Sequence, residues 1–158
     1  MLAKKYHQID FADSLRKTTA EAFGIPLAVF QDDARKEKPL PEYGYPNETP
    51  RSLLIAVGTD LFRSRWPDIW VDSWENKARR LPLVVVTDLR FPNELGRVRA
   101  MGATVIRITR PGVPIVRTEI TESFFEDFDV DFDLVNDGTP EELGEKVLAA
   151  LHAMEVSP

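Results

Sequence analysis

The feature that most constrains the fold is the apolar run Leu83-Val84-Val85-Val86-Thr87. An unbroken run of mostly β-branched residues is typical of a strand buried on both faces of a parallel sheet. Along the chain, short apolar runs alternate with stretches of helical periodicity. This alternation predicts an α/β fold, a three-layer sandwich with a mainly parallel sheet and right-handed crossovers.

Local signals place the other elements. Gly24 is a helix stop, Thr49-Pro50 joins an N-cap to a proline at the first helical position, and Thr139 with Glu142 forms a capping box. The predicted strands cover residues 7–11, 83–87, 103–108 and 132–136, and the predicted helices cover residues 12–23, 50–63, 67–80, 91–101 and 140–154. We expect a single domain over residues 1–158, with an exposed excursion at 25–49 and a lid-like loop at 110–129.

Arginines gather in the middle of a chain whose end is strongly acidic. Residues 118–158 contain twelve acidic side chains and one base, giving −11, whereas residues 1–117 contain 19 bases and 14 acids, giving +5. Eleven of the thirteen arginines lie between Arg51 and Arg117. Such a stretch is a solvated surface, a nucleic-acid face or a pocket for small phosphates. Because the acidic end argues against long nucleic acid, we expect a compact anionic ligand.

The composition excludes several kinds of chemistry. The chain has no cysteine and only two histidines, His7 and His152, so disulfides, thiolate metal sites and multi-histidine metal sites are not expected. No apolar stretch approaches the roughly 18–20 residues that a membrane-spanning helix needs. No apolar run follows the lysines near the N-terminus, as a secretory signal would require. The sequence therefore predicts a protein of the reducing cytoplasm.

The residues that follow the predicted 83–87 strand are candidates for a ligand site, because open α/β sheets bind ligands at the carboxyl ends of their strands. Asp88 could hold Mg²⁺, directly or through water, or anchor a substrate hydroxyl. Arg90 could make a bidentate contact with a phosphate. The alternative is structural: Asp88 caps the next helix, and Arg90 pairs with Glu94.

Two further pairs of residues also allow a functional and a structural interpretation. Arg110 and Arg117 follow the predicted 103–108 strand, where they either stabilise charge during phosphoryl transfer or are surface arginines of a loop. Trp70 and Trp74 either stack on a nucleobase or, at their helical spacing, belong to the core.

The predicted helix at 50–63 has one apolar face. Gly58 lies in it between Arg51 and Arg63, and it allows either a close backbone approach or a tight helix crossing. The apolar residues recur at helical spacing and are expected to share the buried face: Leu53, Leu54, Val57 and Leu61.

No phosphate-binding loop of the form G-x-x-x-x-G-K-[ST] occurs in the sequence. That motif cradles nucleotide phosphates with backbone amides and a lysine. The eight glycines are Gly24, Gly44, Gly58, Gly96, Gly102, Gly112, Gly138 and Gly144. None of them belongs to such a motif.

An ordered set of segments nevertheless resembles the deoxynucleoside monophosphate (dNMP) kinases of tailed phages over nearly the whole chain. The set is far more specific than any one member. The segments are residues 50–60, 69–71, 87–90 with Glu94, 100–106, 110–112, 120–122 and 136–138, and residues 11–16 are similar to the segment after the P-loop helix.

The resemblance implies a P-loop kinase fold that transfers the ATP γ-phosphate to a dNMP with Mg²⁺. By residue match it assigns Trp70, Asp88, Arg90 and Glu94 to the dNMP site, with Asp88 as a possible metal ligand. Arg51 and Arg63 would support that site, and Arg110 and Arg117 would serve the lid. The catalytic residues implied in this way are Asp88, Arg90, Arg110 and Arg117.

The sequence departs from the family at its N-terminus, where the first strand and the Walker A loop are missing. In the family that strand lies between the strands at 83–87 and 103–108. Two explanations stay open: Met1 is an internal methionine of a longer kinase, or the short chain is a natural product. The first predicts an enzyme, and the second a non-catalytic nucleotide-binding or protein-interaction module. Either leaves a homodimer open.

Overall fold

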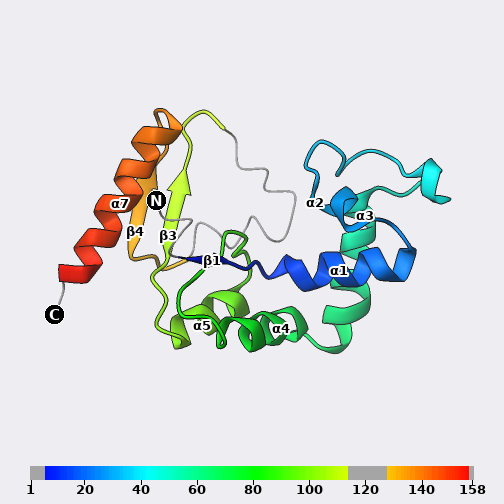
Figure 1. The fold of residues 1–158 in the computed structure, drawn as a ribbon, viewed down its shortest axis with the longest axis horizontal. Coiled ribbons are helices and arrows are strands. Elements are labelled where there is room, and N and C mark those ends of the chain that lie inside the picture. The colour runs from blue at the N-terminus through cyan, green and yellow to red at the C-terminus, as the bar shows by residue number, and fades with distance from the viewer. Residues whose placement is uncertain (1–5, 114–127, 157–158) are drawn as a thin grey trace. The chain divides into compact units, whose positions relative to one another are not determined.

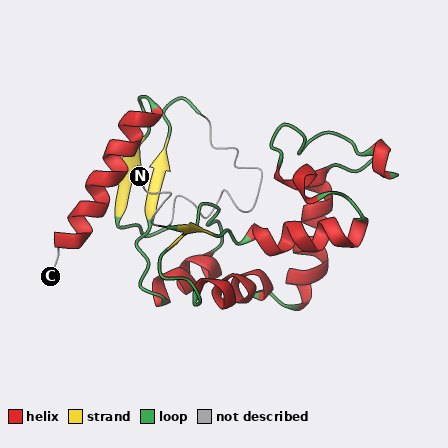
Figure 2. Ribbon diagram, in the orientation of Figure 1, coloured by secondary structure: helices red, strands yellow, loops and turns green. Residues whose placement is uncertain are grey.

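The computed structural model describes residues 6–113 and 128–156. The chain divides into two compact units, Met1–Leu89 and Arg90–Pro158 (Figure 1). Among the described residues, each unit contains helices and one pair of parallel strands, which confirms the α/β class (Figure 2). Within the described ranges, no helix combines the length and the apolar character that crossing a membrane would require.

The first unit contains a two-stranded parallel sheet. Strand β1 (His7–Gln8) pairs with β2 (Val84–Val85) in the register His7 to Val84. The prediction of a strand buried on both faces was wrong here, since Val85 is 41% exposed and Leu83 is 38% exposed. Among the described residues β2 has β1 as its one hydrogen-bonded neighbour, and such a short pair cannot be covered on both faces.

Helix α1 (Ala12–Phe23) has the predicted bounds. It ends at Gly24, whose φ of 65° is left-handed and whose N–H bonds to the carbonyls of Ala20 and Glu21. A left-handed residue after the last turn favours glycine because other side chains meet steric strain there. The stop signal in the sequence therefore acts through backbone conformation.

The segment 25–49 combines exposed residues with residues of the core. It contains helix α2 (Leu27–Gln31) and the 3-10 helix η2 (Pro41–Tyr43). Its charged part, 32–39, is exposed except for a half-buried Arg35. Its apolar residues instead build a core, because Leu40 is fully buried and the flanking helices supply the other members. The buried cluster consists of Ala20, Ile25, Val29, Phe30, Leu40 and Leu53.

Helix α3 (Pro50–Ile55) continues directly into the π-helix η3 (Ala56–Arg63). The Thr49 side chain caps α3 by accepting from the Ser52 N–H at 3.1 Å, as its N-cap signal predicted. The single α-helical face expected for 50–63 does not persist, and Leu61 is 63% exposed. A π-helix turns more widely than an α-helix, so residues beyond Ala56 leave the α-helical phase.

Helix α4 (Ile69–Ala78) packs against α1 in the same unit (Figure 1). Gly58 of η3 also meets α1 closely. A Cβ added to Gly58 would lie 2.7 Å from Cδ2 of Leu15. Of the two interpretations of Gly58, this close approach supports a tight helix crossing.

The second unit joins helix α5 (Pro92–Ala100), strands β3 (Ile106–Thr109) and β4 (Phe132–Val135), and helix α7 (Pro140–Val156). β3 and β4 are parallel, and α7 packs along β4 (Figure 1). The capping box predicted for α7 is confirmed. The Thr139 N–H donates to the Glu142 carboxylate at 2.7 Å, and the Glu142 N–H donates to the Thr139 hydroxyl at 3.2 Å.

Candidate functional site

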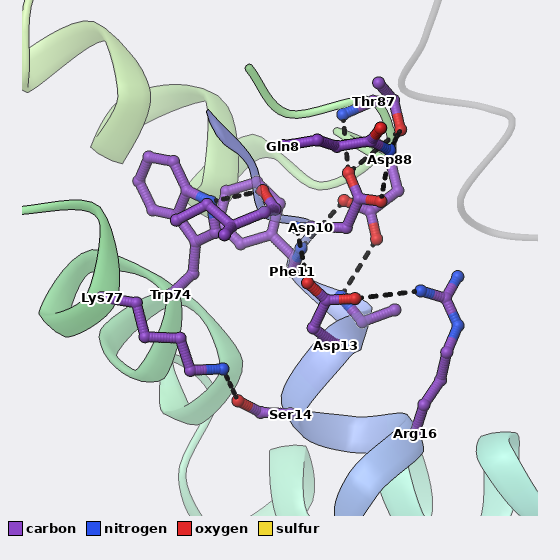
Figure 3. A network of polar contacts seen from close by, with 12 residues as sticks. Gln8, Asp10, Phe11, Asp13, Ser14, Arg16, Trp74, Lys77, Thr87 and Asp88 are labelled. Carbon is purple, nitrogen blue, oxygen red and sulfur yellow. Dashed lines mark hydrogen bonds and ion pairs between the residues drawn. The ribbon is translucent and has the colours of Figure 1, made fainter. Parts of the chain in front are cut away.

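Asp88 follows β2 and binds the first turn of α1. Its Oδ1 accepts the Phe11 N–H at 2.9 Å, and its Oδ2 accepts the Ala12 N–H at 3.0 Å (Figure 3). Asp88 therefore caps the first turn of α1. A carboxylate at a helix N-terminus satisfies free amides and is favoured by the helix dipole. This half-buried carboxylate is thereby held in one orientation at the carboxyl end of β2.

Asp10, which follows β1, connects the carboxyl end of that strand to Thr87, the residue before Asp88. The Asp10 Oδ1 accepts from the Thr87 N–H at 2.8 Å and from the Thr87 hydroxyl at 3.0 Å (Figure 3). Gln8 donates to both residues, at 3.1 Å to Asp10 and at 3.2 Å to Thr87. The Asp13 carboxylate in turn accepts the Asp10 N–H at 3.0 Å. Both strand ends thus carry carboxylates that bind main-chain amides across the sheet.

Sequence reasoning missed Asp10 and Thr87 as part of this polar group. Asp10 lies just after β1, as Asp88 lies just after β2. Because the carboxyl ends of parallel strands meet at one edge of a sheet, that shared position was an available signal. In the part of the chain that the structure describes, no three or more His, Cys, Asp or Glu side chains are arranged to hold a metal ion.

Glu94 and Arg90 lie together at the start of α5 in the second unit. The Glu94 carboxylate is 2% exposed and accepts the main-chain N–H of Arg90 at 2.9 Å and of Phe91 at 3.1 Å. The predicted pairing of Arg90 with Glu94 therefore runs through the Arg90 backbone amide. The Arg90 side chain itself is exposed.

The supporting arginines of the first unit have different surroundings. Arg51 Nε lies 2.5 Å from Oε1 of Glu37, in an ion pair between α3 and the charged segment. The main-chain N–H of Arg51 also donates to the Lys36 carbonyl at 3.0 Å. Arg63 is half-buried at the last position of η3.

Trp70 and Trp74 are both buried in the first unit, at 5% and 4% exposure. The Trp70 indole N–H donates to the Gly58 carbonyl at 3.2 Å, and its ring meets Phe62 edge to face at 5.4 Å. The Trp74 indole N–H donates to the Ile9 carbonyl at 3.0 Å. The core interpretation of both tryptophans matches this burial.

Arg110 follows β3 and is exposed, in a turn where Gly112 has a left-handed φ of 77°. Residues 114–127, with Arg117 and most of the predicted lid at 110–129, lie outside the described residues. The structure therefore places Asp88 after β2 and Arg90 beside Glu94, and Arg51, Arg63 and Trp70 belong to the first unit.

Helices, parallel strands and polar side chains at the carboxyl ends of strands define an α/β protein. The chain belongs to the deoxynucleotide monophosphate kinase family, whose model matches residues 46–147.

Three relatives carry that description. The deoxynucleotide monophosphate kinase of Enterobacteria phage T4 is 36% identical over 110 residues, which are 66% of this chain and 46% of the phage protein. The enzyme of Escherichia phage RB69 is 34% identical over 103 residues, 61% of this chain and 42% of that protein. A putative deoxynucleotide monophosphate kinase of Acanthamoeba polyphaga mimivirus is 29% identical over 156 residues, 89% of this chain and 80% of the relative. The chain thus spans less than half the length of the two phage kinases.

Proposed function

We propose that this chain binds a deoxynucleoside monophosphate and takes part in phosphoryl transfer to it from ATP. One observation carries the proposal: the segment matched by the family, 46–147, contains every residue that the resemblance assigned to the chemistry. These residues are Arg51, Arg63, Trp70, Asp88, Arg90, Glu94, Arg110 and Arg117. Either dGMP or dTMP serves as the acceptor in the experiment that tests this proposal.

Asp88 is proposed to orient the acceptor nucleotide. Its two oxygens accept amides of α1 at 2.9 and 3.0 Å, so the carboxylate does not need to reorganise when a ligand arrives. Preorganised polar groups contribute most to catalysis because they avoid that reorganisation. The Asp88 carboxylate also offers the oxygen ligand that Mg²⁺ prefers, with water and phosphate oxygens completing the coordination, and a bound Mg²⁺ would neutralise phosphate charge.

Arg90 is proposed to bind the acceptor phosphate, and Glu94 to hold it in place. The Arg90 guanidinium is exposed, and a guanidinium matches phosphate geometry through paired N–H donors. The buried Glu94 carboxylate fixes the main chain of Arg90 and Phe91 at the start of α5. Arg51 and Arg63 would support the nucleotide, Trp70 would form a wall of its site, and Arg110 and Arg117 would act from the lid.

The proposed setting follows from the family and the sequence. For the whole family protein we propose a three-layer P-loop kinase sandwich, in which this chain supplies one nucleotide-kinase-like domain. The absence of cysteine supports a cytoplasmic setting in the host. Small nucleotides, and no long nucleic acid, are the proposed ligands, and a homodimer is compatible with the proposal.

Thermal-shift and calorimetric titration of the 158-residue chain with a panel of dNMPs and ATP tests this function. We expect dGMP or dTMP to raise the melting temperature, because a ligand that binds only the folded state stabilises it. Arg90→Ala should weaken dNMP binding. Arg80→Ala is the matched control, because Arg80 is also an exposed arginine but follows α4, outside the assigned residues.

An ATP-dependent assay for deoxynucleoside diphosphate then separates two outcomes. Product formation would identify the chain as a kinase. Binding without product would assign it to the non-catalytic binding module. Equal dNMP binding by the wild type and by Arg90→Ala would contradict the role of that arginine, and no response to any nucleotide would contradict the proposed function as a whole.

A further inference from the structure

A lysine and two serines form a cluster between α1 and α4, apart from the residues proposed for nucleotide chemistry. The Lys77 Nζ on α4 donates to the Ser14 Oγ on α1 at 2.5 Å (Figure 3). The Ser14 Oγ is also hydrogen-bonded to the Ser73 Oγ, at 2.7 Å. All three side chains are half-buried. The ammonium group is thus held against the Ser14 hydroxyl, which is itself hydrogen-bonded to Ser73, and it remains partly accessible.

Lys77 differs from two other lysines of the described residues, each of which lies near a carboxylate. Lys36 lies 3.7 Å from Asp33, and Lys146 lies 2.6 Å from Asp137. Within the described residues, 6–113 and 128–156, no carboxylate lies within ion-pair distance of Lys77. A half-buried cation without an opposite charge is poorly stabilised, because burial removes water that would otherwise solvate it.

The charged groups that act on Lys77 both come from α1. Burial lowers the pKa of the Lys77 ammonium, the positive charge of Lys17 lowers this pKa further, and Asp13 partly opposes both effects. Asp13 is itself occupied, since its carboxylate accepts the Asp10 N–H at 3.0 Å and lies 3.5 Å from the Arg16 guanidinium. A lysine with a lowered pKa has a larger share of neutral amine, which is the nucleophilic form.

We propose that Lys77 is an acylation site of this protein, modified by acyl phosphates. The amine attacks the carbonyl carbon of the acyl phosphate. A C–N bond forms, the C–O bond to the phosphate breaks, and inorganic phosphate leaves with the electron pair. The proton released by the amine passes to solvent along the Ser14 and Ser73 hydroxyls. The exposed Lys17 ammonium favours this class of donor, because it attracts the anionic phosphate toward Lys77.

Acylation would change the contact between α1 and α4. An acylated lysine has no positive charge, so the charge-assisted hydrogen bond to Ser14 is lost. The repulsion between Lys77 and Lys17 is lost as well. The modification therefore changes the packing of two helices of the first unit. Acylation of Lys77 does not depend on the proposed nucleotide chemistry.

Labelling with acetyl phosphate, followed by peptide mass spectrometry, tests the proposal. Over a pH series from near neutral to alkaline, we expect Lys77 to be acetylated several-fold faster than Lys38, which is exposed. We also expect its rate to reach half of its maximum at a lower pH than that of Lys38. Lys77 modified no faster than Lys38 at any pH would overturn the proposal.

A pair of matched variants separates the role of Lys17 from general accessibility. Lys17→Gln should slow the labelling of Lys77 and move its pH dependence upward, because one nearby positive charge is gone. Lys38→Gln, the control at another exposed lysine, should leave Lys77 unchanged. An unchanged rate at Lys77 in Lys17→Gln, in a variant whose circular dichroism melt matches the wild type, would also overturn the proposal.

Discussion

At the scale of single residues, Asp88 has a structural role that is compatible with the role proposed for it in ligand binding. Its carboxylate caps α1 through Phe11 and Ala12, and it lies at the strand end where ligands bind in open α/β sheets. The cap does not exclude the functional role, because a fixed carboxylate is what a preorganised site needs. The structural role and the proposed role can be separated by substitution, since stability depends on hydrogen-bond acceptance and the proposed ligand binding depends on charge.

Asp88→Ala should therefore lower the free energy of unfolding by about 1–2 kcal/mol, because two helix N-terminal amides lose their acceptor. Asp88→Asn keeps one oxygen acceptor and should lose less stability. Urea denaturation followed by circular dichroism measures both. Asp33→Ala serves as the control, because the Asp33 side chain is 98% exposed and its surface pair contributes little.

Both Asp88 variants should lose dNMP binding if the charge is required. Full stability in Asp88→Ala would show that the two hydrogen bonds contribute nothing to folding, and undiminished dNMP binding by Asp88→Asn would remove Asp88 from the proposed site.

At the scale of elements, the helix over 50–63 shows what a π-turn changes. The sequence predicted helix throughout, and the chain is helical throughout, but the widening at Ala56 moves Leu61 to solvent. In the same helix Gly58 accepts the Trp70 indole N–H and meets Leu15 at close range. π-Turns are often found at functional sites, and η3 ends at Arg63, one of the proposed supporting residues.

Gly58→Val should destabilise the protein by about 1–3 kcal/mol, since the added side chain overlaps Leu15 in a packed crossing. Gly96→Val on α5 is the matched control, because a Cβ at Gly96 meets no atom within 4 Å. Thermal melts of both variants give the comparison. Adding Leu15→Ala to Gly58→Val should recover part of the loss, and failure to do so would indicate that the crossing is not the cause.

The β3–β4 pair of the second unit is held by acidic side chains whose charge depends on pH. The Val105 N–H donates to the Asp131 carboxylate at 2.7 Å, and this bond, with Arg99, lowers the pKa of Asp131. The Arg107 guanidinium likewise lowers the pKa of Asp133 across the pair. A carboxyl whose pKa is lower in the folded state stabilises the fold above its ordinary pKa, and this contribution is lost as pH falls through the folded value.

Stability should therefore be constant with respect to these two groups near neutral pH and fall on acidification below their ordinary pKa of 3.8. Denaturation midpoints measured across that acid range should depend less steeply on pH in the double variant Asp131→Asn plus Asp133→Asn than in the wild type. The exposed Glu145 provides a control as Glu145→Gln. Identical pH profiles for the double variant and the wild type would contradict the assignment.

At the scale of the whole molecule, the acidic end of the chain is partly neutralised where it folds. Asp131, Asp133 and Asp137 pair with Arg99, Arg107 and Lys146 of the same unit. Arginines of the basic middle thus meet acids of the acidic end in the fold itself. The pairs with Arg99 and Arg107 offset part of the negative charge of residues 118–158.

Part of the fold could be predicted because it depends on neighbouring residues. Gly24, Thr49 and Thr139 act through bonds to residues within four positions, so the ends of α1, α3 and α7 could be located from sequence. The α/β class followed from alternating patterns in the same way. At the site, the sequence identified Asp88 and Arg90 as candidates and left their partners open.

Tertiary structure decided the contacts between distant segments. Asp88 binds amides of α1 that precede it by 77 and 76 positions, and no local pattern marks that partner. The burial of Leu40 inside a charged segment, the place of Trp70 against Gly58 and the approach of Lys77 to Ser14 likewise depend on how helices pack. Local hydrogen bonds and periodicity are encoded over a few residues, whereas packing partners are set only when the chain closes on itself.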